Sequence, residues 1–159
     1  MRLRNKKPIR KDNAPISPKI LLYIEDDAAN RAVARARLGA RYQLLLAEND
    51  SQACELIQAR GSEIDIYLVD IELKDSTLNG LQIIERLRGH PAPADLPAYA
   101  KDLPQTSAPI IVVTAFGETY NRDAVLAAGA DSLILKPVDF FQLERTITSA
   151  ILADVTGKK

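Results

Sequence analysis

Polar residues that can do chemistry follow four apolar runs of this chain. In chain order they are Glu25, Asp26 and Asp27 after residues 20–24, Asp70 after 66–69, Thr114 after 110–113, and Lys136 after 132–135. Each run has the length and polar borders of a strand buried on both faces. Parallel α/β sheets bind ligands at the carboxyl ends of their strands, so these residues are candidates for chemistry rather than packing.

Our leading hypothesis is that Asp70 receives a phosphoryl group. Carboxylates packed within a few Å repel one another, and a cation removes that repulsion. Because the chain has only one His and one Cys, oxygen ligands are expected, and these favour Mg²⁺ or Mn²⁺. A metal held by a few carboxylates keeps positions for phosphate oxygens, which suits transfer to a carboxylate nucleophile. Lys136 would add a positive charge and Thr114 a hydroxyl donor.

Helical patterns alternate with the strand patterns along the chain. Strands are predicted at 20–24, 42–47, 66–70, 110–113 and 132–135, and helices at 28–38, 52–60, 81–88, 119–128 and from 140 onward. We expect Asp50 and Ser51 to cap the second helix, and Asp139 with Gln142 to cap the last one in a pattern similar to a capping box. Alternation of this kind predicts a doubly wound five-stranded parallel sheet with right-handed crossovers.

The chain is expected to be one domain with two tails. Residues 1–18 contain six basic residues, one acid and three prolines and are predicted to be a flexible arm, which leaves a net acidic body at 19–153 and a tail at 154–159. Five prolines between 90 and 109 make a long helix or strand there improbable, so we interpret this stretch as an insertion. An acidic body argues against nucleic-acid binding by the body.

Several classes of site are excluded by the rarest residue types. Cys54 is the only cysteine, so the chain forms no internal disulfide or Cys-rich zinc site, and we interpret Cys54 as a small helix-face residue. His90 is the only histidine, which argues against a multi-histidine metal site or a Ser-His-Asp triad. No apolar run resembles a signal peptide or spans a membrane, so a cytoplasmic location is expected.

The polar residues together resemble the receiver domain of bacterial two-component response regulators, of the chemotaxis-regulator type. The motifs are Glu25-Asp26, Asp70, Thr114-Ala115 and Lys136-Pro137, and the resemblance covers about residues 19–152. It implies a flavodoxin-like (βα)5 fold with strand order 2-1-3-4-5. It also implies a signalling module rather than an enzyme.

The resemblance assigns a role to each matched position. Asp70 would be the phosphoacceptor, and Asp27 a bystander. The implied metal ligands are Glu25, Asp26, Asp70 and the backbone carbonyl of Glu72, and the implied phosphoryl-oxygen ligands are Thr114 and Lys136. A cis peptide bond is expected between Lys136 and Pro137.

The resemblance also implies the partners. A sensor histidine kinase or histidine phosphotransfer protein would donate to Asp70, and the acyl phosphate would shift a two-state equilibrium of the surface around the fourth and fifth strands. Few residues follow the last helix, so no DNA-binding domain is expected. Output would then pass to a downstream protein partner, or the chain is a receiver cut from a longer protein. Homodimerisation stays open.

Three features depart from the family pattern. The loop at 73–79 is longer than usual and lacks a proline, which predicts greater mobility. Leu133 occupies a position that is often aromatic in the family, which argues against the usual coupling between the threonine and an aromatic ring. The insertion at 90–109 lies outside the common pattern and is a candidate partner surface.

Two other functions compete with the phosphoacceptor hypothesis. A degenerate receiver would keep the fold as a protein-binding module without phosphorylation, but such receivers usually lack an acid, the Thr or the Lys. A Mg²⁺-dependent aspartyl phosphohydrolase of the haloacid dehalogenase-like type would carry its nucleophile after the first strand with a second Asp two residues on. Here Asp70 follows the third strand and Glu72 stands two residues later.

Overall fold

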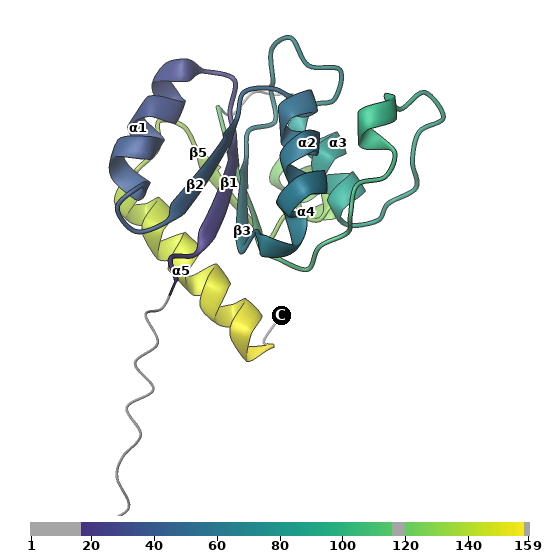
Figure 1. The fold of residues 1–159 in the computed structure, drawn as a ribbon. Coiled ribbons are helices and arrows are strands. Elements are labelled where there is room, and N and C mark those ends of the chain that lie inside the picture. The colour runs from purple at the N-terminus through teal and green to yellow at the C-terminus, as the bar shows by residue number, and fades with distance from the viewer. Residues whose placement is uncertain (1–16, 116–119, 158–159) are drawn as a thin grey trace, which may run out of the picture.

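The protein is a three-layer α/β structure, described by a computed structural model over residues 17–115 and 120–157 (Figure 1). The strands are β1 (Ile20–Ile24), β2 (Gln43–Ala47), β3 (Ile66–Val69), β4 (Ile110–Thr114) and β5 (Ser132–Leu135). The helices are α1 (Ala28–Leu38), α2 (Asp50–Arg60), α3 (Gly80–Leu87), α4 (Arg122–Ala128) and α5 (Phe140–Thr156), with short 3₁₀ turns at Gly61–Glu63 and Ala98–Ala100. All strand pairs are parallel, in the predicted order β2-β1-β3-β4-β5.

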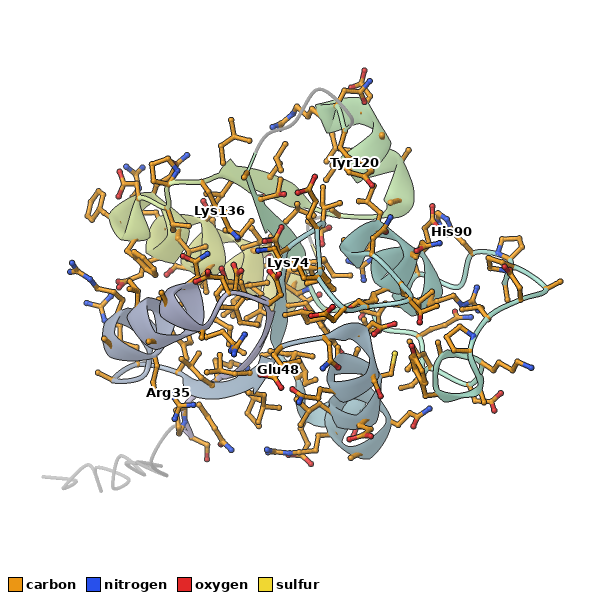
Figure 2. All side chains as sticks on the ribbon, turned by 90° about the horizontal axis from the view of Figure 1, so that it is seen from above. Arg35, Glu48, Lys74, His90, Tyr120 and Lys136 are labelled. Atoms are coloured by element: carbon orange, nitrogen blue, oxygen red, sulfur yellow. The ribbon has the colours of Figure 1, made fainter. Side chains whose placement is uncertain are left out.

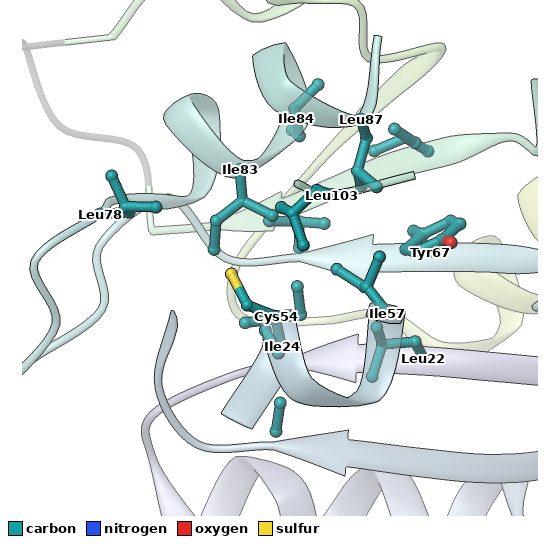
Figure 3. Packing of buried hydrophobic residues seen from close by; sticks show 14 of the residues in the cluster. Leu22, Ile24, Cys54, Ile57, Tyr67, Leu78, Ile83, Ile84, Leu87 and Leu103 are labelled. Atoms are coloured by element: carbon teal, nitrogen blue, oxygen red, sulfur yellow. The ribbon is translucent and has the colours of Figure 1, made fainter. Parts of the chain in front are cut away.

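The sheet is buried on both faces because successive residues of its central strands are all apolar. Leu21 and Tyr23 of β1 pack in a cluster with α1 and α5, whereas Leu22 and Ile24 pack in a second cluster with α2, α3 and α4. Figure 3 shows this second cluster from close by. The alternation sends neighbouring side chains to opposite faces, so a continuous apolar run fills two cores at once.

The helix termini follow the local sequence with three corrections, at the start of α2, the start of α4 and the end of α5. Asn49, not Asp50 or Ser51, caps α2, because its side chain accepts a hydrogen bond from the Gln52 N–H at 2.9 Å. Asp139 caps α5 as predicted and accepts from Phe141 and Gln142. The α5 helix continues to Thr156, beyond the point where the tail was expected. Residue 119, the predicted start of the fourth helix, lies outside the described residues. The described part of α4 begins later than predicted, at Arg122, because Asn121 caps it.

The proline-rich insertion contains no long helix or strand and packs against the core. It has one 3₁₀ turn, at Ala98–Ala100. Three of its residues are buried in the cluster beside α2 and α3, namely Leu96, Ala100 and Leu103. The insertion is therefore part of the folded domain and not only an addition to its surface.

The two ends of the chain add little to the described fold. Of the predicted basic arm, only residues 17 and 18 are described, and both are exposed. Among residues 17–115 and 120–157, no helix combines the length and apolar character needed to cross a membrane.

Candidate phosphoacceptor site

Three carboxylates meet where the chain reverses its direction of winding, between β1 and β3. Glu25 and Asp26 follow β1, and Asp70 follows β3. One carboxylate oxygen of each lies within 4.8 Å of one oxygen of each of the others. The register pairs Ile24 with Val69, which brings the two strand ends level. The sequence predicted this meeting, because the carboxyl ends of adjacent parallel strands share one edge of the sheet.

Lys136 reaches this cluster from the end of β5. Its Nζ lies 2.5 Å from Asp70 Oδ2 and 2.6 Å from Glu25 Oε2. Burial lowers the pKa of the Lys136 ammonium, but hydrogen bonds and charges of Asp70 and Glu25 outweigh it and raise the pKa above its usual value. The peptide bond to Pro137 is cis, as predicted. In the view from above, Lys136 and Lys74 lie near the middle of the molecule (Figure 2).

Asp70 is buried, with 6% of its side chain exposed. Burial raises the pKa of its carboxyl group, and the Glu25 charge acts in the same direction. Hydrogen bonds from Lys136 and Thr114 lower the pKa but do not cancel the rise. The Glu72 N–H approaches Asp70 Oδ1 at 3.3 Å. Asp70 is thus a desolvated carboxylate whose charge the surrounding protein only partly compensates.

Glu25 is fully buried and is held by a partner that the sequence analysis missed. The Tyr23 hydroxyl donates to Glu25 Oε2 at 2.8 Å, and the Asp27 N–H donates to Oε1 at 3.1 Å. Burial and the neighbouring Glu25 raise the pKa of Tyr23, which keeps the phenol a donor. The signal was present in the sequence, since residues two apart on a strand point to the same face.

The remaining predicted residues are Thr114, Ala115 and Asp27. Thr114 ends β4 and is buried, and Ala115 follows it at the surface. Asp27 caps α1 by accepting from the Asn30 N–H at 2.8 Å. That hydrogen bond lowers the pKa of Asp27. The group of close carboxylates in the described residues consists of Glu25, Asp26 and Asp70 and does not include Asp27.

A second residue that sequence reasoning missed is Arg31 of α1. Its Nη1 donates to the backbone carbonyls of Glu25 and Asp26, at 2.7 Å each, and its Nη2 pairs with Glu48 at 3.1 Å. These contacts fix the backbone that carries both acids. No spacing in the sequence pointed to them, because they depend on how α1 folds back over the end of β1.

The loop after Asp70 is tied to the acidic cluster at Asp26 and to the start of α2 at Asp50. The Lys74 N–H donates to Asp26 Oδ2 at 3.2 Å, and the Thr77 and Leu78 N–H groups donate to Asp50. Leu78 is buried. The absence of a proline therefore does not leave this loop without contacts, although greater mobility was expected from the sequence.

The donor atoms of the cluster fit a hard divalent cation. The three grouped residues offer only carboxylate oxygens. A cation would offset the effect of burial, and with it the smaller effect of the Glu25 charge, which together raise the pKa of Asp70. Mg²⁺ prefers such oxygens and keeps several water ligands. Glu25, Asp26 and Asp70 would hold it, and it would supply positive charge to phosphoryl oxygens.

The sheet order and the site define a doubly wound α/β protein with an acidic cluster and a lysine at the topological switch point. The response regulator receiver domain family has a model that matches residues 21–148, so the chain belongs to that family. This confirms the predicted resemblance and fold, and places the chain among the receiver domains of two-component signalling.

Curated relatives are longer proteins. The chain is 30% identical over 131 residues to the response regulator ArlR of Staphylococcus epidermidis, which covers 82% of this chain and 52% of ArlR. It is 25% identical to the transcriptional regulatory protein ZraR of Klebsiella oxytoca, over 82% of this chain and 26% of ZraR. The chain thus spans about half the length of the first of these relatives and about a quarter of the second.

Solved structures share the fold. A CheY-like receiver domain from Methanospirillum hungatei superposes with a TM-score of 0.69 at 23% identity, covering 89% of this chain and 99% of that one. The receiver domain of the sensor histidine kinase PA1611 from Pseudomonas aeruginosa gives 0.63 at 24% identity, over 85% and 98% of the two chains. That structure holds a magnesium ion in its active site cleft.

Proposed function

We propose that this chain is a phosphoacceptor receiver domain in which Asp70 takes a phosphoryl group from a histidine kinase or a histidine phosphotransfer protein. The observation that carries the proposal is the position of Lys136. One ammonium contacts both Asp70 and Glu25 in a buried cluster with Asp26. Such a cluster puts a carboxylate nucleophile beside a cation that attracts phosphoryl oxygens.

The transfer exchanges one phosphorus bond for another. An Asp70 carboxylate oxygen forms the new P–O bond, the P–N bond to the donor imidazole breaks, and the imidazole nitrogen keeps the electron pair. Lys136 and the Thr114 hydroxyl would donate to oxygens of the transferred group. Mg²⁺ would add charge neutralisation when bound to Glu25, Asp26, Asp70 and the Glu72 carbonyl, and the same oxygen donors would accept Mn²⁺.

The role in signalling follows from the proposed chemistry. The acyl phosphate adds charge beside Lys136 and Thr114, at the ends of β5 and β4, and biases the surface that these elements carry. We propose that a downstream protein partner, or a second copy of the chain, recognises that surface in the cytoplasm. Receiver domains are generally signalling modules rather than enzymes, and we propose the same for this chain.

Intact mass spectrometry with Mg²⁺ and a small phosphoramidate or acyl phosphate donor tests the proposal. We expect a gain of one phosphoryl group in the parent protein and none in Asp70→Asn. Asp27→Asn is the matched control, because Asp27 belongs to the same acidic run but caps α1. It should gain the group as the parent does.

The other outcomes distinguish the competing functions. No gain in the parent, with the fold intact, would support a phosphorylation-independent binding module. An equal gain in Asp70→Asn would show that another residue accepts the group. Sustained turnover of a phosphate ester in Mg²⁺, lost in Asp70→Asn, would instead support a phosphohydrolase.

A further inference from the structure

Asp50 is a buried carboxylate outside the phosphoacceptor cluster. It is the first residue of α2, is 2% exposed and does not cap the helix. Within the described part of the chain, no Lys, Arg or His forms an ion pair with it. A buried charge is costly unless several donors compensate it, so its partners indicate what it holds in place.

Those partners come from two segments distant in sequence. Asp50 Oδ2 accepts from the Thr77 N–H at 3.1 Å, the Leu78 N–H at 2.8 Å and the Tyr99 hydroxyl at 2.6 Å. Oδ1 accepts from the Ser51 N–H at 2.9 Å. Thr77 and Leu78 belong to the loop that follows Asp70, and Tyr99 belongs to the proline-rich insertion. One carboxylate therefore joins α2, this loop and the insertion.

The same loop touches the acidic cluster at its other end. The Lys74 N–H donates to Asp26 Oδ2 at 3.2 Å, and the Ser76 hydroxyl accepts from the Asp50 N–H at 3.1 Å. Only a short stretch of backbone thus separates the Asp50 contacts from an oxygen of a predicted metal ligand. A displacement at Thr77 and Leu78 would move Lys74 and leave Asp26 free to turn.

The insertion supports the contact from the outside. Leu96, Ala100 and Leu103 anchor it in the core, and Gln58 of α2 donates to the Tyr99 carbonyl at 2.9 Å. The Tyr99 hydroxyl therefore approaches Asp50 from a fixed backbone. This gives the insertion a role inside the domain, apart from any partner that its exposed prolines contact.

We infer that Asp50, supported by Tyr99, is a positioning residue that holds the loop after the phosphoacceptor in the conformation that orients Asp26. This inference rests on the proposed function, since Asp26 is placed there as a Mg²⁺ ligand. Hydrogen bonds to a ligating carboxylate fix its orientation, and losing such outer contacts commonly weakens metal binding by tenfold or more.

The test combines amide hydrogen exchange of the loop with Mg²⁺ titration by calorimetry. In Asp50→Ala we expect the Thr77 and Leu78 amides to exchange faster and the Mg²⁺ dissociation constant to rise about tenfold, or about 1.4 kcal/mol. Tyr99→Phe removes one hydrogen bond and should raise the Mg²⁺ dissociation constant about threefold. Asp50→Asn keeps an oxygen acceptor of similar geometry and should recover part of the affinity.

Asp65→Ala is the matched control. Asp65 also accepts a backbone N–H, from Ile20 at 2.8 Å, and pairs with Lys19, but it lies at the opposite end of the sheet. Asp65→Ala should leave the amide exchange of the loop and the Mg²⁺ dissociation constant unchanged. If Asp65→Ala shifts Mg²⁺ binding as far as Asp50→Ala does, general destabilisation explains the effect and the inference is overturned.

A phosphorylation series separates positioning from loss of folded protein. At saturating Mg²⁺, Asp50→Ala should regain the parent rate with a small phosphodonor, whereas unfolding would lower the rate at every Mg²⁺ concentration. If Asp50→Ala fails to fold, Tyr99→Phe decides, and parent-like exchange and Mg²⁺ binding in it overturn the inference. Faster loop exchange and weaker Mg²⁺ binding in Asp50→Ala support the positioning role even if the parent protein is not phosphorylated. A failure of this inference can therefore be told apart from a failure of the proposed function.

Discussion

Asp70 and Asp27 have the same side chain but opposite electrostatic settings. Asp70 is buried among other carboxylates, and its pKa is raised above the usual carboxyl value of 3.8. Asp27 stands at the start of α1, where the Asn30 N–H lowers its pKa. The environment disfavours the charge of Asp70 and favours that of Asp27.

This contrast predicts the effect of Asp70→Asn on stability. The pKa of Asp70 is raised in the folded state. The contribution of Asp70 to the free energy of unfolding is therefore fully present below pH 3.8 and is lost as the pH rises through the raised pKa. At neutral pH without Mg²⁺, the ionised carboxylate therefore costs stability. Replacing it by a neutral amide should raise the free energy of unfolding by about 1 kcal/mol, measured by urea denaturation in a chelator.

Asp27→Asn serves as the control with the opposite sign. Its lowered pKa means that the ionised form contributes stability above pH 3.8 and that this contribution is lost on acidification. The substitution should not raise the free energy of unfolding. Equal stabilisation by both substitutions would show that net negative charge, rather than the burial of Asp70, decides the result.

At the scale of the elements, the start of α3 lies against the backbone of the phosphoacceptor. A Cβ on Gly80 would stand 2.0 Å from the Asp70 carbonyl oxygen, and the Gly80 N–H donates to the Ile71 carbonyl at 2.8 Å. Asn79 caps the helix in a full capping box with Gln82. The cap and the glycine together let the helix begin close to the end of β3.

Gly80→Ala should therefore disturb both the fold and the site. Backbone must move to relieve the overlap, so we expect a loss of about 2 kcal/mol of stability and slower phosphorylation of Asp70. Gly61→Ala is the control, since its Cβ would meet the Pro104 side chain at 3.1 Å rather than backbone. It should change stability by less than about 1 kcal/mol. A parent-like phosphorylation rate in Gly80→Ala would contradict the argument.

At the scale of the whole molecule, the acidic cluster links metal binding to folding. Its residues come from β1 and β3, which the folded sheet holds side by side and the unfolded chain does not. A ligand that binds only the folded state stabilises it by mass action. The cluster should thus make the stability of the entire domain depend on divalent cations.

Thermal and urea unfolding at several Mg²⁺ concentrations test this dependence. At 100 times the dissociation constant, Mg²⁺ should add about 2.7 kcal/mol to the free energy of unfolding. Asp26→Asn should lose most of this increment and Asp27→Asn should keep it. An increment that persists in Asp26→Asn would place the cation elsewhere.

Much of this architecture was encoded locally. The apolar runs at residues 20–24 and 66–69 predicted buried strands, and their alternation with helices predicted a doubly wound parallel sheet. The strand order came from the resemblance to receiver domains. Asp70 and Lys136 were predicted to meet because both stand at carboxyl ends of strands. Local rules were less reliable for caps, since Asn49 and Asp50 are both good N-cap residues and only the packing of α2 decides between them.

The sequence by itself determined that an aspartate, two further acids, a threonine and a lysine would gather at one edge of a parallel sheet, because strand periodicity places them there. Only the tertiary structure decided how they are held. The Arg31 contacts to the backbone carbonyls of Glu25 and Asp26 are set by packing between segments. So is the hydrogen bond from the Tyr99 hydroxyl to Asp50, which joins residues 49 positions apart. Periodicity is a local property, whereas the closure of loops over one another depends on the whole chain.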